Sequence, residues 1–359
     1  GDGDGFESTP VGLLGTHGTH GPNDHFGYAL VPVGDFDGDG WDDLAAVSRK
    51  GARPSSFDDD VLNPDDCPGT RTDAGEVLIH RGGPDGLADA PSFVWYGPDS
   101  GGFVYRARGG FDRDGDGFGD LLVGSDLWGD GGGFAIVPGR PAEDGLLVLC
   151  DAETYLASSR FDRLGWSLAV LGDLDGDGCD EVAAGAPGDE AGYFNQGIVR
   201  LLWGTGATCA PGPRATLLGL SVVGAEAGTS LAGGGDVDGD GVPDLAVGGA
   251  AFRADFAEVG SAFVVPGARL LALPTQAHDL GVLPDDDAGP LQLMLAGDGL
   301  EARYGLIGEV AGGLFGAAVA LVPDPTDPLR YALAVGAPQG TGGGTALSGR
   351  VAIHRWQGE

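Results

Sequence analysis

The sequence predicts an all-β fold, a β-propeller built from four-stranded blades. An acidic loop of nine residues recurs four times at spacings of 77, 61 and 63 residues. Short apolar runs precede and follow each loop, as in Phe26–Val33 and Leu44–Val47, and no helical periodicity accompanies them. Repeats of this length, each with room for several short strands, are typical of propeller blades. The four loops begin at Asp35, Asp112, Asp173 and Asp236.

The residue types in the loops predict a cage for a hard cation. Carboxylates stand at positions 1, 3, 5 and 9, and the residue at position 7 can add a backbone carbonyl oxygen. Calcium takes about 6–8 oxygen ligands in a flexible shell, whereas magnesium requires a stricter octahedron, so about four calcium ions are expected. The acids are Asp35, Asp37, Asp39 and Asp43; Asp112, Asp114, Asp116 and Asp120; Asp173, Asp175, Asp177 and Glu181; and Asp236, Asp238, Asp240 and Asp244. The position-7 residues are Trp41, Phe118, Cys179 and Val242.

Glycines at positions 4 and 6 of every loop, such as Gly38 and Gly40, support this interpretation. A backbone that winds around an ion needs positive φ angles, which glycine adopts at little cost. A single loop of this kind is also compatible with a solvated acidic turn. Four copies that all keep the acid at position 9 favour the cation site.

The order of motifs resembles the FG-GAP repeat of the integrin α-subunit β-propeller. Phe26-Gly27 and Phe315-Gly316 match its first element, and Gly185-Ala186-Pro187 and Gly336-Ala337-Pro338 match its last. The second repeat has neither element in clear form. The resemblance implies a propeller with calcium in the loops and ligand recognition on the opposite face. That face would carry the polar excursion 49–74 and the histidine-containing loop 17–25.

Composition limits the possible partners. The chain has 359 residues and a net charge of −35, so it is expected to repel nucleic acid and anionic membranes. No apolar run approaches the roughly 20 residues of a membrane span, and no membrane insertion is expected. A single domain over 1–359 is predicted, secreted or at the cell surface.

The expected strands follow the loops around the ring. Blade one has Phe26–Val33, Leu44–Ser48, Gly75–Arg81 and Ser92–Tyr96. Blade two begins near Phe103 and ends with Leu121–Val123, Phe134–Val137 and Leu146–Leu149; blade three runs from Leu164 to Leu218; blade four begins near Thr229 and includes Ala262–Val265. The pattern blurs over 266–313, where Leu291–Leu295 and Tyr304–Ile307 are possible strands of a further, degenerate blade.

The last unit has Phe315–Val322, Tyr331–Gly336 and Arg350–Trp356. Prolines over Pro323–Pro328, and Ala332 at position 9, remove the ligands, so no calcium is expected there. This blade lacks a fourth strand, which residues 10–15 would supply as the outer strand that closes the ring, with 1–9 as a linker or processed start. Five blades fit best and six are the alternative; a neighbouring chain that completes the last blade is also compatible with the pattern.

Four cysteines in an acidic protein suggest an oxidising, extracellular setting. In a four-stranded blade the first and third turns share one face, which favours a disulfide between Cys179 and Cys209. Cys67 and Cys150 would share the opposite face and form the second pair. Free buried thiols are the alternative.

No catalytic constellation is evident, and the chain is interpreted as a binding module rather than an enzyme. His17, His20 and His25 are spaced for a possible second metal site or for a flexible polar turn. Trp128 and Trp203 are candidates for stacking on sugars if exposed, or for packing between blades.

The resulting prediction is a calcium-stabilised adhesion module that binds a protein or glycan partner, with self-association possible. The alternatives are a structural subunit of a surface appendage or multidomain adhesin, and a carbohydrate-active enzyme or lectin-like domain.

Overall fold

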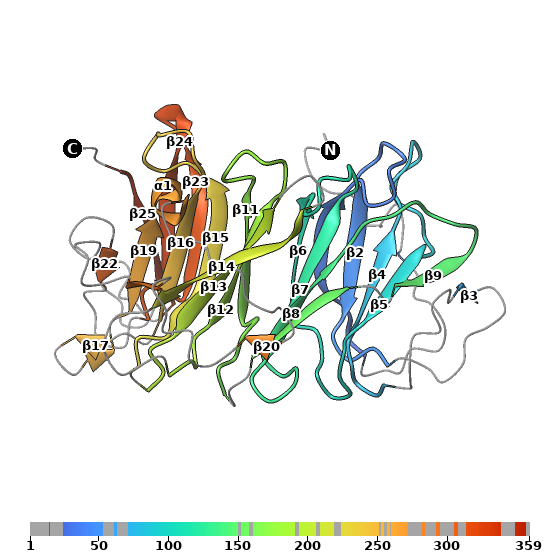
Figure 1. Ribbon diagram of the computed structural model, residues 1–359, viewed down its shortest axis with the longest axis horizontal. Helices are drawn as coiled ribbons and strands as arrows, with labels where there is room; N and C mark the ends of the chain where they lie inside the picture. The colour runs from blue at the N-terminus through green and yellow to red at the C-terminus, as the bar shows by residue number, and fades with distance from the viewer. Residues whose placement is uncertain are drawn as a thin grey trace, which may run out of the picture.

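The computed structural model describes residues 14, 24–52, 61–62, 71–149, 152–157, 161–190, 194–205, 209–218, 224–250, 253–254, 257–258, 260–271, 282–283, 292–294, 305–307, 314–338 and 349–356. These residues form an all-β structure with one short helix, α1 (Gly267–Leu271). Figure 1 shows the sheets side by side in chain order, from the N-terminal sheet on the right to the C-terminal sheet on the left.

Four sheets are built on four antiparallel strands that pair in chain order. The first has β1 (Phe26–Gly34), β2 (Asp43–Ser48), β4 (Glu76–His80) and β5 (Phe93–Tyr96). The second has β6 (Arg106–Phe111), β7 (Asp120–Ser125), β8 (Gly133–Val137) and β10 (Glu153–Ala157). The third has β11 (Ser167–Gly172), β12 (Glu181–Ala186), β13 (Ile198–Thr205) and β14 (Ala210–Leu218). The fourth has β15 (Ala227–Gly235), β16 (Asp244–Gly249), β19 (Ser261–Val265) and β22 (Gly305–Ile307).

The fifth sheet has three described strands, and short parallel strands extend the others. Its strands are β23 (Ala318–Asp324), β24 (Asp327–Ala337) and β25 (Arg350–His354). The additional strands are β9 (Leu146–Leu149) and β3 (Val61–Leu62) in the first sheet, β20 (Val282–Leu283) in the second and β21 (Gln292–Met294) in the third; β17 (Arg253–Ala254) and β18 (Ala257–Glu258) form a separate hairpin.

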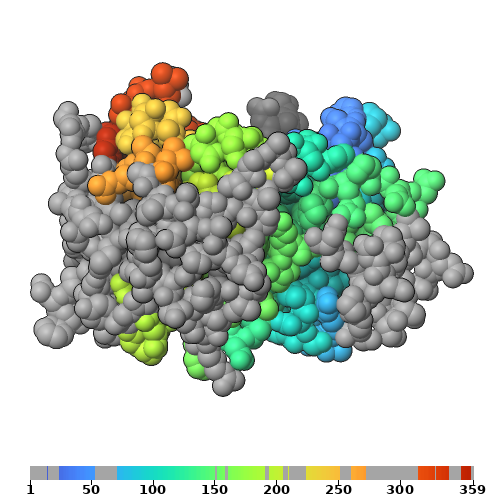
Figure 2. Space-filling view, viewed as in Figure 1, coloured from blue at the N-terminus to red at the C-terminus, as the bar shows by residue number. Residues whose placement is uncertain are grey.

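The first strands of successive sheets pack against one another, β1 with β6, β6 with β11, β11 with β15 and β15 with β23. This succession of twisted sheets is the arrangement of a β-propeller. In Figure 2 the colours of the described residues run from blue on the right to orange and red on the left, so the chain proceeds along the long axis of the molecule. The number of blades and the closure of the ring remain predictions, and residues 1–9 and 10–15 lie outside the described part except for Leu14.

Two strand assignments from the sequence are wrong. Leu146–Leu149 belongs to the first sheet, where β9 runs parallel to β5, and the outer strand of the second sheet is Glu153–Ala157. All four leucine and valine side chains of β9 are buried, which suits a strand covered on both faces. Tyr304–Ile307 is part of no further blade, because β22 pairs with β19 as the fourth strand of the fourth sheet.

The core lies between the sheets rather than within one of them. Each pair of neighbouring sheets encloses one apolar cluster, such as Phe36, Ile79, Trp95 and Val123 between the first two. Trp128 is fully buried there and Trp203 is 6% exposed, so both indoles pack in the core, as in the packing interpretation, and the alternative of stacking on sugars is wrong. The Trp128 Nε1–H donates to the Phe103 carbonyl at 2.8 Å, which satisfies its polar atom.

Candidate cation site

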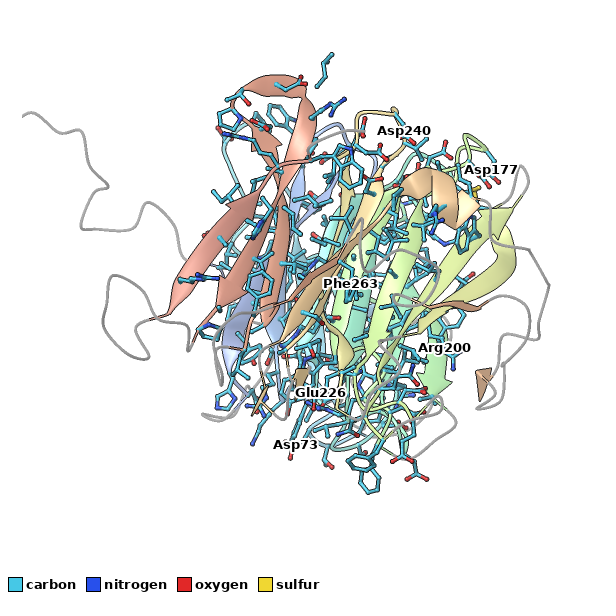
Figure 3. All side chains as sticks on the ribbon, turned by 90° about the vertical axis from the view of Figure 1, so that its left-hand side faces the viewer. Asp73, Asp177, Arg200, Glu226, Asp240 and Phe263 are labelled. Atoms are coloured by element: carbon cyan, nitrogen blue, oxygen red, sulfur yellow. A yellow bond between two sulfur atoms is a disulfide. The ribbon has the colours of Figure 1, made fainter. Side chains whose placement is uncertain are left out.

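Each acidic loop connects the first strand of a sheet to the second, so all four loops lie at the same end of the molecule. Figure 3 shows Asp177 and Asp240 at this end, with Asp73 and Glu226 at the other end. We call these two ends the acidic-loop end and the opposite end.

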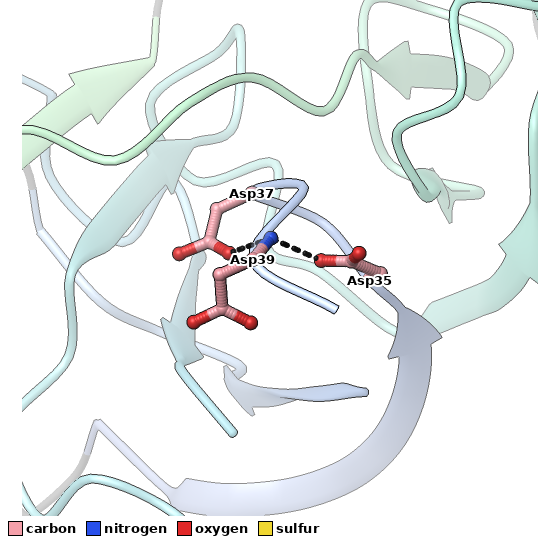
Figure 4. A group of neighbouring side chains, drawn as sticks. All are labelled: Asp35, Asp37 and Asp39. Atoms are coloured by element: carbon pink, nitrogen blue, oxygen red, sulfur yellow. Dashed lines mark hydrogen bonds between the residues drawn. The ribbon is translucent and has the colours of Figure 1, made fainter. Parts of the chain in front are cut away.

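Backbone N–H groups hold the position-1 carboxylate of every loop. In the first loop Asp39 N donates to Asp35 Oδ1 at 2.9 Å and to Asp37 Oδ1 at 3.2 Å (Figure 4), and Gly40 N donates to Asp35 Oδ2 at 2.9 Å. The other loops repeat the position-6 bond, from Gly117 to Asp112, Gly178 to Asp173 and Gly241 to Asp236, at 2.9, 3.0 and 2.9 Å. The glycines at positions 4 and 6 all have positive φ, as predicted: Gly38, Gly40, Gly115, Gly117, Gly176, Gly178, Gly239 and Gly241.

The carboxylates of each loop converge. In every loop three of them each offer an oxygen within 4.8 Å of the others, a spacing that one ion can bridge. The groups are Asp35, Asp37 and Asp39; Asp112, Asp114 and Asp120; Asp173, Asp175 and Glu181; and Asp236, Asp238 and Asp244. The position-9 acid therefore joins the group in three loops, whereas position 5 takes its place in the first.

The position-9 acid has a second role that the sequence did not reveal. In each loop one carboxylate oxygen accepts the N–H of position 2, and the other accepts an N–H at or just beyond the end of the third strand. For Asp120 these donors are Arg113 N at 2.6 Å and Gly139 N at 2.8 Å. Asp43, Glu181 and Asp244 make the same pair of bonds, so this side chain connects the loop to the end of the third strand of its own sheet.

These position-9 groups are buried, and burial raises their pKa values. The pKa is raised to about 6 for Asp43, about 7 for Asp120, about 8 for Glu181 and about 7 for Asp244. Burial is also the main cause of the raised pKa of Asp114, Asp175 and Asp238 at position 3, and the neighbouring position-5 carboxylate is the second. The loops thus hold like charges close together in a poorly solvated place. A divalent cation bound to an all-oxygen set would offset that repulsion, so the residues present fit calcium.

The first loop differs because it contains a guanidinium. Arg81 follows β4 and forms ion pairs with Asp37 through Nε and with Asp39 through Nη2, the latter at 2.9 Å. The equivalent residues before the turn glycine in the next three sheets are Pro138, Trp203 and Pro266, which bring no charge. Arg81 is distant from the loop in sequence, so no local pattern predicted it.

The third loop carries the disulfide that was predicted. Cys179 at position 7 is bonded to Cys209, with 5.6 Å between their Cα atoms, and both are buried. Its backbone N–H donates to Asp177 Oδ1 at 3.0 Å. The bond ties the acidic loop to the start of β14. Cys67 and Cys150 lie outside the described residues.

The fifth sheet meets the expectation of a different turn. Asp324 Oδ1 accepts bonds from the Thr326 backbone N–H at 2.8 Å and hydroxyl at 2.6 Å, and Arg355 Nε lies 3.0 Å from Asp324 Oδ2. The hydrogen bonds to Thr326 are the main cause of the lowered pKa of Asp324. Its charge is therefore satisfied within the protein. Of the proposed histidine site, His17 and His20 lie outside the described residues, and His25 is exposed with a φ of 57°.

Fold and loops together define a class: a β-propeller in which four of the five described sheets carry an acidic loop with converging carboxylates in their first turn. Comparison with known proteins makes the class more specific. Residues 164–202, which span β11 to β13 and the third loop, match the FG-GAP repeat. Integrin alpha-PS2 of Drosophila melanogaster is 29% identical over 240 residues, covering 62% of this chain and 15% of that protein. Integrin alpha-V of Gallus gallus is 29% identical over 244 residues, covering 65% and 20%.

The chain is a β-propeller that contains an FG-GAP repeat and is similar to integrin alpha subunits. It spans only 15% and 20% of the length of the two relatives. Among solved structures, the Dos1 propeller has a TM-score of 0.42 and 11% identity, covering 90% of this chain and 58% of that one. In the described part of the chain no helix has the length and apolar character needed to cross a membrane.

Proposed function

We propose that this chain is a calcium-stabilised adhesion module that recognises a partner protein and performs no chemistry of its own. The observation that carries the proposal is the set of four acidic loops, each with three carboxylates converging at the same end of its sheet. The similarity to integrin alpha subunits supports an adhesion role and a cell-surface setting.

In this proposal calcium has a structural role. Positions 1, 3, 5 and 9 of each loop would hold the ion, and Trp41, Phe118, Cys179 and Val242 would add backbone carbonyl oxygens. The bound ion supplies positive charge among carboxylates that repel one another, which stabilises the turn between the first two strands. Because position 9 also bonds an N–H at the end of the third strand, cation binding would stabilise the loop and that strand end together in each of the four sheets.

The test is thermal unfolding of chelated protein titrated with calcium and, separately, with magnesium. A ligand that binds only the folded state at 100 times its Kd stabilises by about 2.7 kcal/mol per site. We therefore expect a large rise in Tm that calcium produces at lower concentration than magnesium, with a stoichiometry of about four by calorimetry. An unchanged Tm would contradict the structural role of the loops.

Recognition would use the opposite end, away from the cations. Trp128 and Trp203, the two candidates for stacking on a sugar, are in the core. The similarity to integrin alpha subunits supports a protein partner. The single variants Asp39→Asn, Asp116→Asn, Asp177→Asn and Asp240→Asn would separate the structural role of calcium from partner recognition. Each weakens one acidic loop and leaves the opposite end unaltered.

A further inference from the structure

The opposite end carries a continuous series of cationic and aromatic side chains across the first three sheets. We call it the cation–aromatic ladder; in order of contact its members are Lys50, Phe103, Arg49, Tyr105, Arg106, Trp166 and Arg163. Arg49 and Lys50 follow the end of β2. Phe103 and Tyr105 precede β6, which begins at Arg106, and Arg163 and Trp166 precede β11. These are the strand ends away from the acidic loops.

Contacts connect each member to the next. In the first half of the ladder, Lys50 Nζ lies 5.3 Å from the Phe103 ring centroid, and the Arg49 Cζ lies 5.2 Å from the same ring and 4.5 Å from the Tyr105 ring. Arg49 Nη2 also donates to the Tyr105 hydroxyl at 2.7 Å. These bonds and stacked rings fix the guanidinium in one place.

The second half continues on the same pattern. Arg106 donates from Nη1 to the Tyr105 carbonyl at 3.1 Å and from Nε to the Trp166 carbonyl at 3.0 Å. The Trp166 ring has the Arg106 Cζ at 5.7 Å and the Arg163 Cζ at 3.8 Å from its centroid. Tyr28, 45% exposed, adds a ring at 6.3 Å from Tyr105.

The positive charges of the ladder have no acidic partner among the described residues. The chain has 54 acidic and only 19 basic residues, so a basic side chain would be expected to find a carboxylate. Within the part that the structure describes, Arg49, Lys50, Arg106 and Arg163 form no ion pair, whereas Arg81, Arg200, Arg330 and Arg355 do. Among the described residues, the ladder is therefore a fixed row of positive charge without a carboxylate partner, on a strongly acidic protein.

We propose that the ladder binds an acidic segment of the partner protein, an inference that rests on the proposed function. Side chains held in place lose little entropy when they bind, and guanidinium forks match carboxylates. Four cations spread over three sheets suit an extended peptide with several carboxylates. Stacking on a sugar is disfavoured because guanidiniums already lie over the Tyr105 and Trp166 rings.

The probe is a fluorescein-labelled oligo-glutamate peptide, followed by fluorescence polarisation on the calcium-loaded chain in about 20 mM and about 150 mM salt. An anionic peptide should avoid a protein of charge −35 unless it finds a cationic site. We expect binding at low salt, weaker binding at high salt and none by a labelled oligo-glutamine peptide.

Two double variants test the location. Arg106→Gln with Arg163→Gln should weaken oligo-glutamate binding about tenfold or more. Arg330→Gln with Arg355→Gln removes the same charge from the acidic-loop end and should change the affinity for oligo-glutamate less than about twofold. Equal losses in both, or no binding by the unaltered chain, would overturn the proposal. Tighter binding of a hyaluronate oligosaccharide than of the peptide would also overturn it, in favour of a glycan.

Thermal unfolding of the same samples separates this inference from the function on which it rests. A calcium-dependent Tm without peptide binding removes the ladder proposal and leaves the structural cation sites standing. A Tm that does not respond to calcium removes the proposed function itself. Unchanged Tm values in the two double variants would show that lost binding is not lost folding.

Discussion

The convergence of the carboxylates in the acidic loops could be predicted from the sequence because all of them lie within nine consecutive residues. Their positions follow from the backbone of the loop, and the glycines at positions 4 and 6 permit it. The groups that modify the loops come from elsewhere in the chain. Gly82, whose N–H donates to Asp43, lies 39 residues after it in the chain. Arg81 lies more than 40 residues after Asp39, with which it pairs. Such contacts depend on how the strands pair, which the local pattern does not contain.

We expect the first loop to bind a cation more weakly than the other three, because the Arg81 guanidinium must leave Asp37 and Asp39 when an ion binds. Arg81→Gln should raise the cation affinity of this loop about tenfold, a modest effect because the arginine is 36% exposed and partly screened. Trp41 at position 7 allows a site-specific measurement, since its indole can sensitise the emission of bound terbium. A terbium titration should therefore reach half its emission at a lower concentration in the variant.

Two controls accompany this titration. Trp41→Phe should remove the emission that responds to Arg81→Gln, which identifies the first loop as its source. Arg71→Gln, at an arginine that donates to the Gly97 carbonyl, should leave the curve unchanged. An identical curve for Arg81→Gln and the unaltered chain would show that the guanidinium does not compete with the ion.

His80 gives the first sheet a sensitivity to acid. It is fully buried, and its Nδ1 lies 3.0 Å from the Ala88 carbonyl oxygen. Burial lowers the pKa of His80 below its ordinary value of 6.5. The unfolded chain therefore takes up this proton at a higher pH than the folded chain does. The contribution of neutral His80 to stability is present above pH 6.5 and is lost as the pH falls from there to the lowered pKa.

The His80→Gln variant tests this sign. Glutamine can donate to the Ala88 carbonyl but does not titrate, so the free energy of unfolding of the unaltered chain should fall relative to the variant by up to about 1.4 kcal/mol per pH unit. Urea unfolding at pH 7.5, 6.5 and 5.5 measures the difference. A constant difference across this range would contradict the assignment.

At the scale of elements, the FG and GAP motifs are two halves of one contact between neighbouring sheets. Gly185 is the glycine of a GAP motif, and Gly228 is at the FG glycine position of the following sheet. A Cβ added to Gly185 would lie 2.2 Å from the carbonyl oxygen of Gly228. A Cβ added to Gly248 would likewise lie 2.1 Å from the carbonyl oxygen of Gly316. The Ser167 and Ser230 hydroxyls donate to these two carbonyls at 2.6 and 2.8 Å. The motif is therefore a packing device, which explains why it predicts fold better than function.

The FG glycines offer a matched pair of variants. Gly27 and Gly316 have φ values of 79° and 84°, but a Cβ on Gly316 would lie 2.0 Å from the Ser261 carbonyl oxygen, whereas one on Gly27 would meet no atom within 4 Å. Gly27→Ala should cost about 1 kcal/mol for the positive φ alone. Gly316→Ala should cost roughly 1–3 kcal/mol more. Denaturant unfolding measures both, and equal losses would contradict the account of the motif.

The strand order could be predicted only where a strand pairs with its neighbour in the chain. β1, β2 and β4 follow from the loop and from alternating apolar runs. β9 does not, because Leu146–Leu149 is apolar throughout and joins either sheet equally well by pattern. Its parallel pairing with β5 depends on the packing of two sheets against each other.

At the scale of the whole molecule, the GAP–FG contact is absent between the last and first sheets as described. A Cβ added to Gly336 would have atoms of Ala318 as its nearest neighbours, and a Cβ added to Gly27 would meet no atom within 4 Å. Val351 and Ile353 on β25 are 71% and 65% exposed, and Leu30 on β1 is 59% exposed. In the part of the chain that the structure describes, no strand pairs with the outer edge of β25. Proteins normally cover an exposed apolar strand face and an unpaired sheet edge.

Closure of the ring by residues 10–15 as the outer strand of this sheet remains our proposal. If it is right, deletion of residues 1–15 should free the edge of β25 and raise the hydrogen-exchange rates of the Arg350–His354 amides, because strand pairing protects backbone N–H groups. The Glu181–Ala186 amides of β12, held between two strands of the third sheet, should exchange as before. Deletion of residues 1–9 alone should leave the exchange rates of both segments unchanged.

Mass spectrometry of peptides from the monomeric fraction measures these exchange rates in the unaltered chain and in the two deletion variants. If β25 exchanges equally fast with and without residues 10–15, that segment does not close the sheet. Protection that appears only as protein concentration rises would instead assign closure to a neighbouring chain.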